Sequence, residues 1–269
     1  MATDSIDLTA ASGWVLAACG VGLAPLASPI LRRIDPPRSV FFARWGFSHL
    51  LLAAAVGLLV FVAGGWLAGD GAAGRLLRSD SYLFGAVVIA LVAAQRTQPE
   101  SWRALGLAHA HPVRAVGIGV VLWAFAGPMI WGCSAAWAEL LTDLGVDDVR
   151  VGFGATYDEL QGTSRIGLAV LLVAVAPLLR EVLFRGFAQP LLVQNFSERG
   201  GVLLSALFFA LLYPPGAFLP AFVLGVACAL AYLRSGSLWA PLTVHALHQA
   251  TAIALLGAGW ADPDRLPLF

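Results

Sequence analysis

The sequence is poor in charged residues. Only 12% of its 269 residues are Asp, Glu, Lys or Arg, against 59% hydrophobic residues, and the mean hydropathy is +0.82. Soluble domains have about 45–50% apolar and about 25% charged residues, so a water-soluble globule is excluded. Disordered chains are rich in charge and poor in apolar residues, so disorder is excluded as well. The composition predicts a protein embedded in a lipid bilayer.

Basic tracts and cysteine patterns are also missing. There is no lysine, the net charge is zero and the Arg residues form no tract, so nothing indicates a nucleic-acid partner. Cys19, Cys133 and Cys228 each lie in an apolar run, and their spacings match neither a disulfide framework nor a thiolate metal site. We expect them to be small buried hydrophobic residues. Met1–Gly13 has two Asp and no basic residue, which predicts that the first apolar run stays as an anchor rather than being cleaved as a signal peptide.

Eight apolar runs predict the fold. A helix needs about 20 mostly apolar residues to cross the hydrocarbon core, and the backbone must satisfy its own hydrogen bonds there. The runs are Trp14–Ile30, Ser48–Ala68, Tyr82–Ala94, Ala115–Ala138, Ile166–Leu179 (continuing as a more polar helix to Phe196), Gly201–Tyr213, Ala217–Leu233 and Leu238–Ala258. We predict an all-α polytopic transmembrane bundle of about eight helices. The runs from Tyr82, Ile166 and Gly201 are short, so each could be tilted or re-entrant.

Arginine placement predicts the orientation. Eight crossings with both termini outside put eleven Arg and four acidic residues on the inner side, and five Arg and twelve acidic residues on the outer side. Positive charge is retained on the cytoplasmic side during insertion, so this arrangement is favoured. We expect an integral protein of the bacterial inner membrane, surrounded by membrane lipids.

The stretch from Arg180 to Gly186 places charged residues next to an apolar run. If it is helical, Glu181 and Arg185 are four residues apart and can pair on one face. Charges at membrane depth suggest function. By itself, however, the stretch is more typical of a helix end whose Arg side chains reach the headgroups.

The last predicted helix carries a polar face. His245, His248 and Gln249 share one side of an otherwise apolar helix, which must look into the bundle or a wet cavity. They could ligate a metal (His245 and His248) or hold a catalytic water, or they could form interhelical hydrogen bonds. Tyr213 ends an apolar helix before two prolines, where an aromatic belt position is ordinary. The remaining histidines suggest packing or loop positions; they are His49, His109 and His111.

In this order, these pieces resemble the CPBP family of intramembrane proteases, also called the ABI family, which includes CAAX prenyl endopeptidases and bacteriocin-processing proteins. The matching residues are Glu181, Phe184, Arg185 and Gly186 for the Glu-Glu-x-x-x-Arg motif, Phe209 and Tyr213 for Phe-x-x-x-His, and His245 and Gln249 for His-x-x-x-Asn, with Leu105-Gly106-Leu107 as the entry to the core. The resemblance divides the chain into variable N-terminal helices (1–99), a CPBP-like protease domain (100–258) and a short tail (259–269).

The resemblance implies an intramembrane endopeptidase that acts on a membrane-anchored protein or peptide. Its first glutamate activates water, the motif histidines assist, and the asparagine steadies the oxyanion. Participation of zinc is disputed within the family. The chemistry needs a base and an oxyanion donor in a low-dielectric site.

Key positions of these motifs are substituted here. Arg180 stands where the first glutamate belongs and cannot act as a base. Tyr213 replaces the second-motif histidine, and Gln249 replaces the asparagine while keeping an amide. Two cations beside Glu181 would also weaken it as a base.

These substitutions favour a non-hydrolytic or sharply impaired member, a pseudoenzyme. One alternative is an active endopeptidase with a rebuilt site, either of the CAAX type or one that processes a sorting signal. In that site Glu181 would be the base, and Tyr213 or Arg180 would be the oxyanion donor. His245 and His248 would be metal ligands or acid catalysts. A proton-coupled transporter is another alternative, although the sequence shows no internal repeat. A purely structural anchor would not explain the polar face of the last helix.

Overall fold

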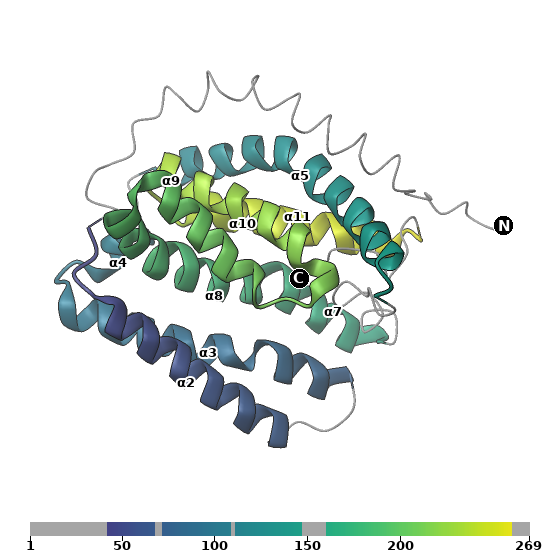
Figure 1. Ribbon diagram of the computed structural model, residues 1–269, viewed down its shortest axis with the longest axis horizontal. Coiled ribbons are helices and arrows are strands. Elements are labelled where there is room, and N and C mark those ends of the chain that lie inside the picture. The colour runs from purple at the N-terminus through teal and green to yellow at the C-terminus, as the bar shows by residue number, and fades with distance from the viewer. Residues whose placement is uncertain (1–41, 68–71, 109–110, 147–159, 260–269) are drawn as a thin grey trace.

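The computed structural model describes residues 42–67, 72–108, 111–146 and 160–259, and within these ranges the chain forms helices and no strand. The predicted helical membrane bundle is therefore confirmed. Figure 1 shows α2 (Phe47–Leu67) and α3 (Ala72–Thr97) along one side and α5 (Pro112–Asp143) along the opposite side. Helices α10 (Pro215–Ser235) and α11 (Trp239–Gly257) lie between them. The predicted run Trp14–Ile30 lies outside the described residues, as does Cys19.

The first two described helices form an antiparallel pair. They are α2 (Phe47–Leu67) and α3 (Ala72–Thr97). A Cβ at Gly57 would come within 2.9 Å of the Tyr82 carbonyl oxygen, so this glycine permits the close approach of the two helices. The opposite face of α2 is exposed and apolar, with Leu59 68% and Trp66 86% exposed. In a bilayer that face contacts lipid.

The central part of the chain enters the bundle through a tight turn. Helix α4 (Ser101–Ala104) is followed by Gly106, which has a φ of +80° and lies so close to Tyr232 that a Cβ would come within 2.8 Å of its ring. The carbonyl of Gly106 also accepts a hydrogen bond from Leu238 N at 2.9 Å. The turn is thus joined to the start of the last helix. Helix α5 (Pro112–Asp143) then runs for 32 residues against α10 and α11, longer than the predicted Ala115–Ala138.

A continuous helical path carries the charged stretch. It consists of α7 (Gly162–Val170), the π-helix η2 (Leu171–Val175), α8 (Ala176–Glu181), the π-helix η3 (Val182–Ala188) and α9 (Gln189–Ala210). Insertions of π-helix are rare and frequently occur at functional sites. Here they lie directly before and after the helical turns that hold Arg180 and Glu181.

Helix α9 reverses at Ser197. This residue has φ 75° and ψ 167°, a conformation that is not helical. After the reversal the chain packs back on itself so closely that a Cβ at Gly201 would lie 2.5 Å from the Val193 side chain. The predicted separate helix Gly201–Tyr213 is therefore the returning half of α9, and it ends at Ala210.

The last two helices form the interior of the bundle. Helix α10 (Pro215–Ser235) ends at Gly236, which has a φ of 68°, and α11 (Trp239–Gly257) follows. Buried residues cover most of α10, as expected for a helix enclosed by protein rather than by lipid.

The predicted number of spans is not supported. Among the described residues four helices are long and apolar enough to cross a membrane: Phe47–Leu67, Pro112–Asp143, the path Gly162–Ala210 and Pro215–Ser235. Helix α3 has a shorter apolar part, Ser81–Thr97. The predicted last run does not qualify as a span because His245, His248 and Gln249 reduce the mean hydropathy of α11.

A tryptophan joins the N-terminal region to the charged stretch. The Trp45 ring stacks on Phe187 with centroids 5.0 Å apart, and its Nε1 donates to the Phe187 carbonyl at 2.9 Å. Trp45 is 2% exposed. Because Phe187 lies in η3, this contact fixes the π-helix that follows Glu181.

We expect Trp45→Phe to lower the free energy of unfolding by about 1 kcal/mol, because it keeps a stacked ring and loses one buried hydrogen bond. Trp45→Ala should cost about 3–5 kcal/mol through the cavity that it leaves. Unfolding in detergent micelles measures both. The control is Trp102→Phe, since Trp102 is 49% exposed and its change should stay within about 0.5 kcal/mol. Equal losses at both positions would contradict this account.

Candidate functional site

The polar residues of the predicted motifs gather inside the bundle from four parts of the chain. Arg180 and Glu181 end α8, Arg185 lies in η3, and His245 lies on α11. Each is at most 2% exposed. Tyr213 follows the returning half of α9. Buried polar groups must be paired to be tolerated, so their partners show what the site can do.

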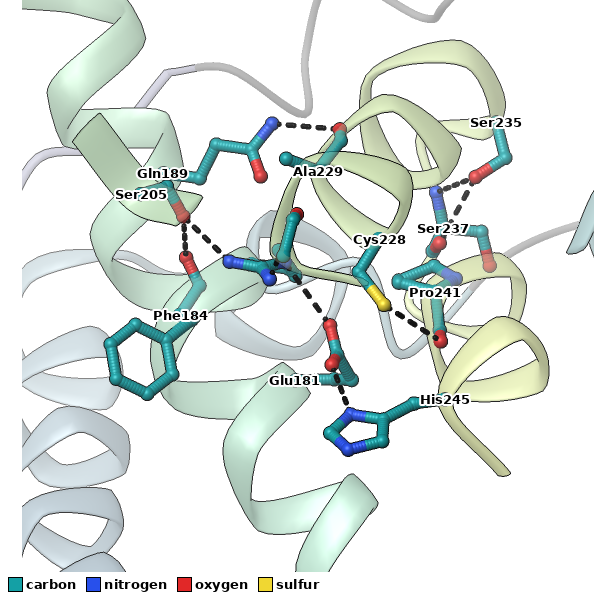
Figure 2. A network of polar contacts seen from close by, with 12 residues as sticks. Glu181, Phe184, Gln189, Ser205, Cys228, Ala229, Ser235, Ser237, Pro241 and His245 are labelled. Atoms are coloured by element: carbon teal, nitrogen blue, oxygen red, sulfur yellow. Dashed lines mark hydrogen bonds and ion pairs between the residues drawn. The ribbon is translucent and has the colours of Figure 1, made fainter. Parts of the chain in front are cut away.

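Glu181 is the centre of the cluster. Its Oε1 lies 2.7 Å from His245 Nδ1, and its Oε2 lies 3.3 Å from Arg185 Nε (Figure 2). The pairing of Glu181 with Arg185 predicted from their spacing is confirmed. The carboxylate is thus held between a cation and an imidazole. Glu181 and His245 are 64 residues apart in the sequence, so this contact depends on the tertiary fold.

Arg185 is anchored on three sides. Its Nη1 donates to Ser205 Oγ at 2.7 Å and its Nη2 donates to the Gly225 carbonyl at 3.1 Å. Ser205 Oγ in turn donates to the Phe184 carbonyl at 3.3 Å. These contacts tie η3 to α9 and α10, so Arg185 positions Glu181 and joins three parts of the bundle.

Phe209 packs the aromatic side of the site. Its ring centroid lies 5.2 Å from Tyr213 and 5.7 Å from His245, and the Arg185 guanidinium carbon lies 5.3 Å from the ring centre. The Arg180 guanidinium carbon lies 5.3 Å above the Tyr213 ring. Such a distance is typical of a cation–π contact. The two residues that replace the expected glutamate and histidine therefore contact each other.

The polar face of the last helix points inward as predicted. His245, His248 and Gln249 are all 0% exposed. His245 and His248 have different neighbours, however. His248 packs edge-on against Trp131 at 6.2 Å, whereas His245 contacts Glu181. The suggested metal pair His245 and His248 is not the group of donors that the structure brings together.

The group of potential metal ligands in the described residues consists of Glu181, Cys228 and His245. One ligand atom from each lies within 4.8 Å of the other two, and all three residues are buried. Cys228 was not predicted to be part of a site. It lies in an apolar run on α10 with no His or acidic residue at helical spacing, so only the packing of α10 against α11 could reveal it.

Two other buried side chains were also missed. Gln189 donates from Nε2 to the Ala229 carbonyl at 3.0 Å, and Ser205 holds Arg185. Neither belongs to a recognisable motif. Among the histidines outside the cluster, His49 accepts a hydrogen bond from Gly46 N at 3.2 Å and His111 is exposed before α5. His109 lies outside the described residues.

Comparison with known families identifies this region. Residues 162–251, one third of the chain, match the model of the family described as type II CAAX prenyl endopeptidase Rce1-like. This match confirms the predicted similarity to the CPBP family within these residues. The matched segment contains the complete cluster, from Arg180 to Gln249. No curated protein and no solved structure shows a significant match to the chain.

The CPBP motifs separate into retained and substituted positions in this structure. Glu181, Arg185 and His245 are retained and contact one another directly or through Glu181. Arg180 and Tyr213 are substituted, and they pair with each other. The substituted residues therefore form a second, adjacent part of the same site.

Proposed function

We propose that this CPBP-family membrane protein has lost peptide hydrolysis or retains it only weakly. The observation that carries the proposal is the contact between Arg180 and Tyr213. The family's general base and its histidine partner would occupy these two positions. A guanidinium cannot accept a proton, and a tyrosine is a poor base at neutral pH.

Glu181 is a weak substitute for the missing base. Both of its oxygens are engaged, one by His245 at 2.7 Å and the other by Arg185 at 3.3 Å. A carboxylate paired in this way stabilises the fold. To act as a base, Glu181 would have to accept a proton from water with an oxygen that already contacts His245 or Arg185. The arrangement thus supports a scaffold role for Glu181.

The proposal retains binding without cleavage. A buried polar cluster among lipid-facing helices suits a membrane-anchored protein or peptide as ligand, with membrane lipids around it. We further propose the bacterial inner membrane as its location, with both termini outside and the family domain over residues 100–258. No nucleic-acid partner is part of this proposal.

One observation favours an active enzyme as the second candidate. The contact of 2.7 Å between Glu181 and His245 is a carboxylate–imidazole pair inside a buried site. In this candidate Glu181 acts as base with Arg180 or Tyr213 as oxyanion donor, since both residue types can stabilise such a charge.

A cleavage assay separates the two candidates. We expect the wild-type chain, reconstituted in vesicles with membrane-anchored prenylated peptides ending in a CAAX sequence, to release no product above the level of the Glu181→Ala/His245→Ala double variant. Mass spectrometry of the peptides measures release. Cleavage by the wild type that disappears in the double variant would support the active enzyme and refute the proposal.

A further inference from the structure

Three side chains from three helices bring different donor atoms to one point. Glu181 supplies a carboxylate oxygen from α8, Cys228 a sulfur from α10, and His245 a ring nitrogen from α11. Their ligand atoms lie within 4.8 Å of one another, and the three residues are 0–1% exposed. In Figure 2 the Cys228 sulfur lies beside the Glu181 carboxylate, which also contacts His245.

Outside this group, the Cys228 thiol makes a weak hydrogen bond. Cys228 Sγ donates a long hydrogen bond to the Pro241 carbonyl at 3.7 Å. Ring nitrogen Nε2 of His245 is buried and has no hydrogen-bond partner among the described residues. A cysteine that served only as a small apolar residue would not need to lie next to a carboxylate and an imidazole.

We infer that Glu181, Cys228 and His245 bind one zinc ion, with Cys228 as a thiolate ligand that the CPBP motifs do not contain. Zinc accepts oxygen, sulfur and nitrogen donors together. Thiolate and imidazole donors do not suit magnesium or calcium, which prefer oxygen ligands. Binding breaks the S–H bond of Cys228, and the proton is released to solvent.

The surroundings hold the ligands in place. Arg185 engages Glu181 at Oε2, while Oε1 faces His245 at 2.7 Å, and Arg185 is itself anchored by Ser205 and Gly225. Partners of this kind orient metal ligands and are part of most metal sites.

Charge explains why a thiolate is required. A zinc ion with one carboxylate alone would carry a net positive charge beside Arg185, whose Nε lies 3.3 Å from Glu181. The Cys228 thiolate makes the zinc–carboxylate–thiolate group neutral. Removing the thiol should therefore weaken binding far more than the loss of one ligand at a neutral site.

The inference goes beyond the proposed function and is independent of it. Zinc in this position joins α8, α10 and α11, while position 180 still lacks a base. Metal content and cleavage are therefore separate measurements. Zinc without cleavage supports both proposals, no zinc and no cleavage refutes the metal site alone, and cleavage refutes the proposed function alone.

The test uses the full chain purified in detergent, loaded with zinc or cobalt and dialysed. We expect about one zinc ion per chain by elemental analysis and, with cobalt, the sulfur-to-metal charge-transfer absorption in the near ultraviolet. Cys228→Ala should lose both signals. The matched control Cys133→Ala, which removes the other described buried cysteine, should keep both.

Two results would overturn the inference. One is folded wild-type protein that retains less than about a tenth of a zinc ion per chain, since a site of three ligands should survive dialysis. The other is cobalt-loaded wild type without thiolate absorption, which decides the matter even if Cys228→Ala fails to fold. A Cys228→Ala variant that keeps the wild-type zinc content would also refute it.

Discussion

Arg180→Glu combined with Tyr213→His is expected to raise peptide hydrolysis well above the level of the wild-type chain. The two side chains contact each other, with the Arg180 guanidinium carbon 5.3 Å from the Tyr213 ring centre. The double variant places a carboxylate and an imidazole at these neighbouring positions. A positioned general base contributes about 10²–10⁴-fold to rate, so we expect cleavage of membrane-anchored prenylated peptides to rise at least about 10²-fold.

The retained part of the site should support this gain. Glu181, Arg185 and His245 contact one another at 2.7 and 3.3 Å, and neither substitution removes a member of this group. Each single variant should recover less than the pair, since each leaves one member of the base–histidine pair missing.

The neutral pair Arg180→Gln with Tyr213→Phe is the matched control, because it removes the cation and the hydroxyl without adding a base. It should remain at the wild-type level. A folded Arg180→Glu/Tyr213→His variant whose cleavage rate stays at the wild-type level would show that these two positions do not limit hydrolysis.

Arg185→Met is expected to cause a large loss of stability. Arg185 is 0% exposed and contacts Glu181, Ser205 and the Gly225 carbonyl. Its removal leaves a buried carboxylate without its cation and two polar groups without their donor. Breaking one partner out of a buried ion pair typically costs about 3–5 kcal/mol, a large part of the usual total of about 5–15 kcal/mol.

A second substitution separates charge from packing. Adding Glu181→Gln to Arg185→Met removes the uncompensated charge, so the double variant should be more stable than the sum of the two single losses predicts. Thermal unfolding in detergent measures the cycle. Arg199→Met is the control, because Arg199 is exposed and its loss should cost less than about 0.5 kcal/mol. Additive losses would show that Arg185 stabilises the fold through packing alone.

Local spacing explains which parts of the site the sequence could predict. Glu181 and Arg185 are four residues apart on one helix, so their pairing follows from helical geometry. The inward face of α11 follows from the cost of turning His245, His248 and Gln249 toward lipid. Their three-residue and four-residue spacings also allowed comparison with the CPBP motifs.

Other features have no local signal. Cys228 lies 47 residues after Glu181 in an apolar run, and its place in the cluster depends on how α10 packs between α9 and α11. The sequence also did not predict that the chain reverses at Ser197 within α9. Serine rarely has a positive φ, and the nearby Gly201 indicated only the start of a separate helix.

Composition and hydrophobic runs by themselves determined that this chain is a helical membrane protein, since the bilayer imposes one backbone solution on any long apolar segment. The number of spans, the pairing of Arg180 with Tyr213, the different neighbours of His245 and His248, and the grouping of Cys228 with Glu181 were decided only by tertiary structure. Each of these depends on the packing of helices distant in sequence, and that packing is set by side-chain shape and close contacts such as those at Gly57 and Gly106. Periodicity in a single chain does not contain this information.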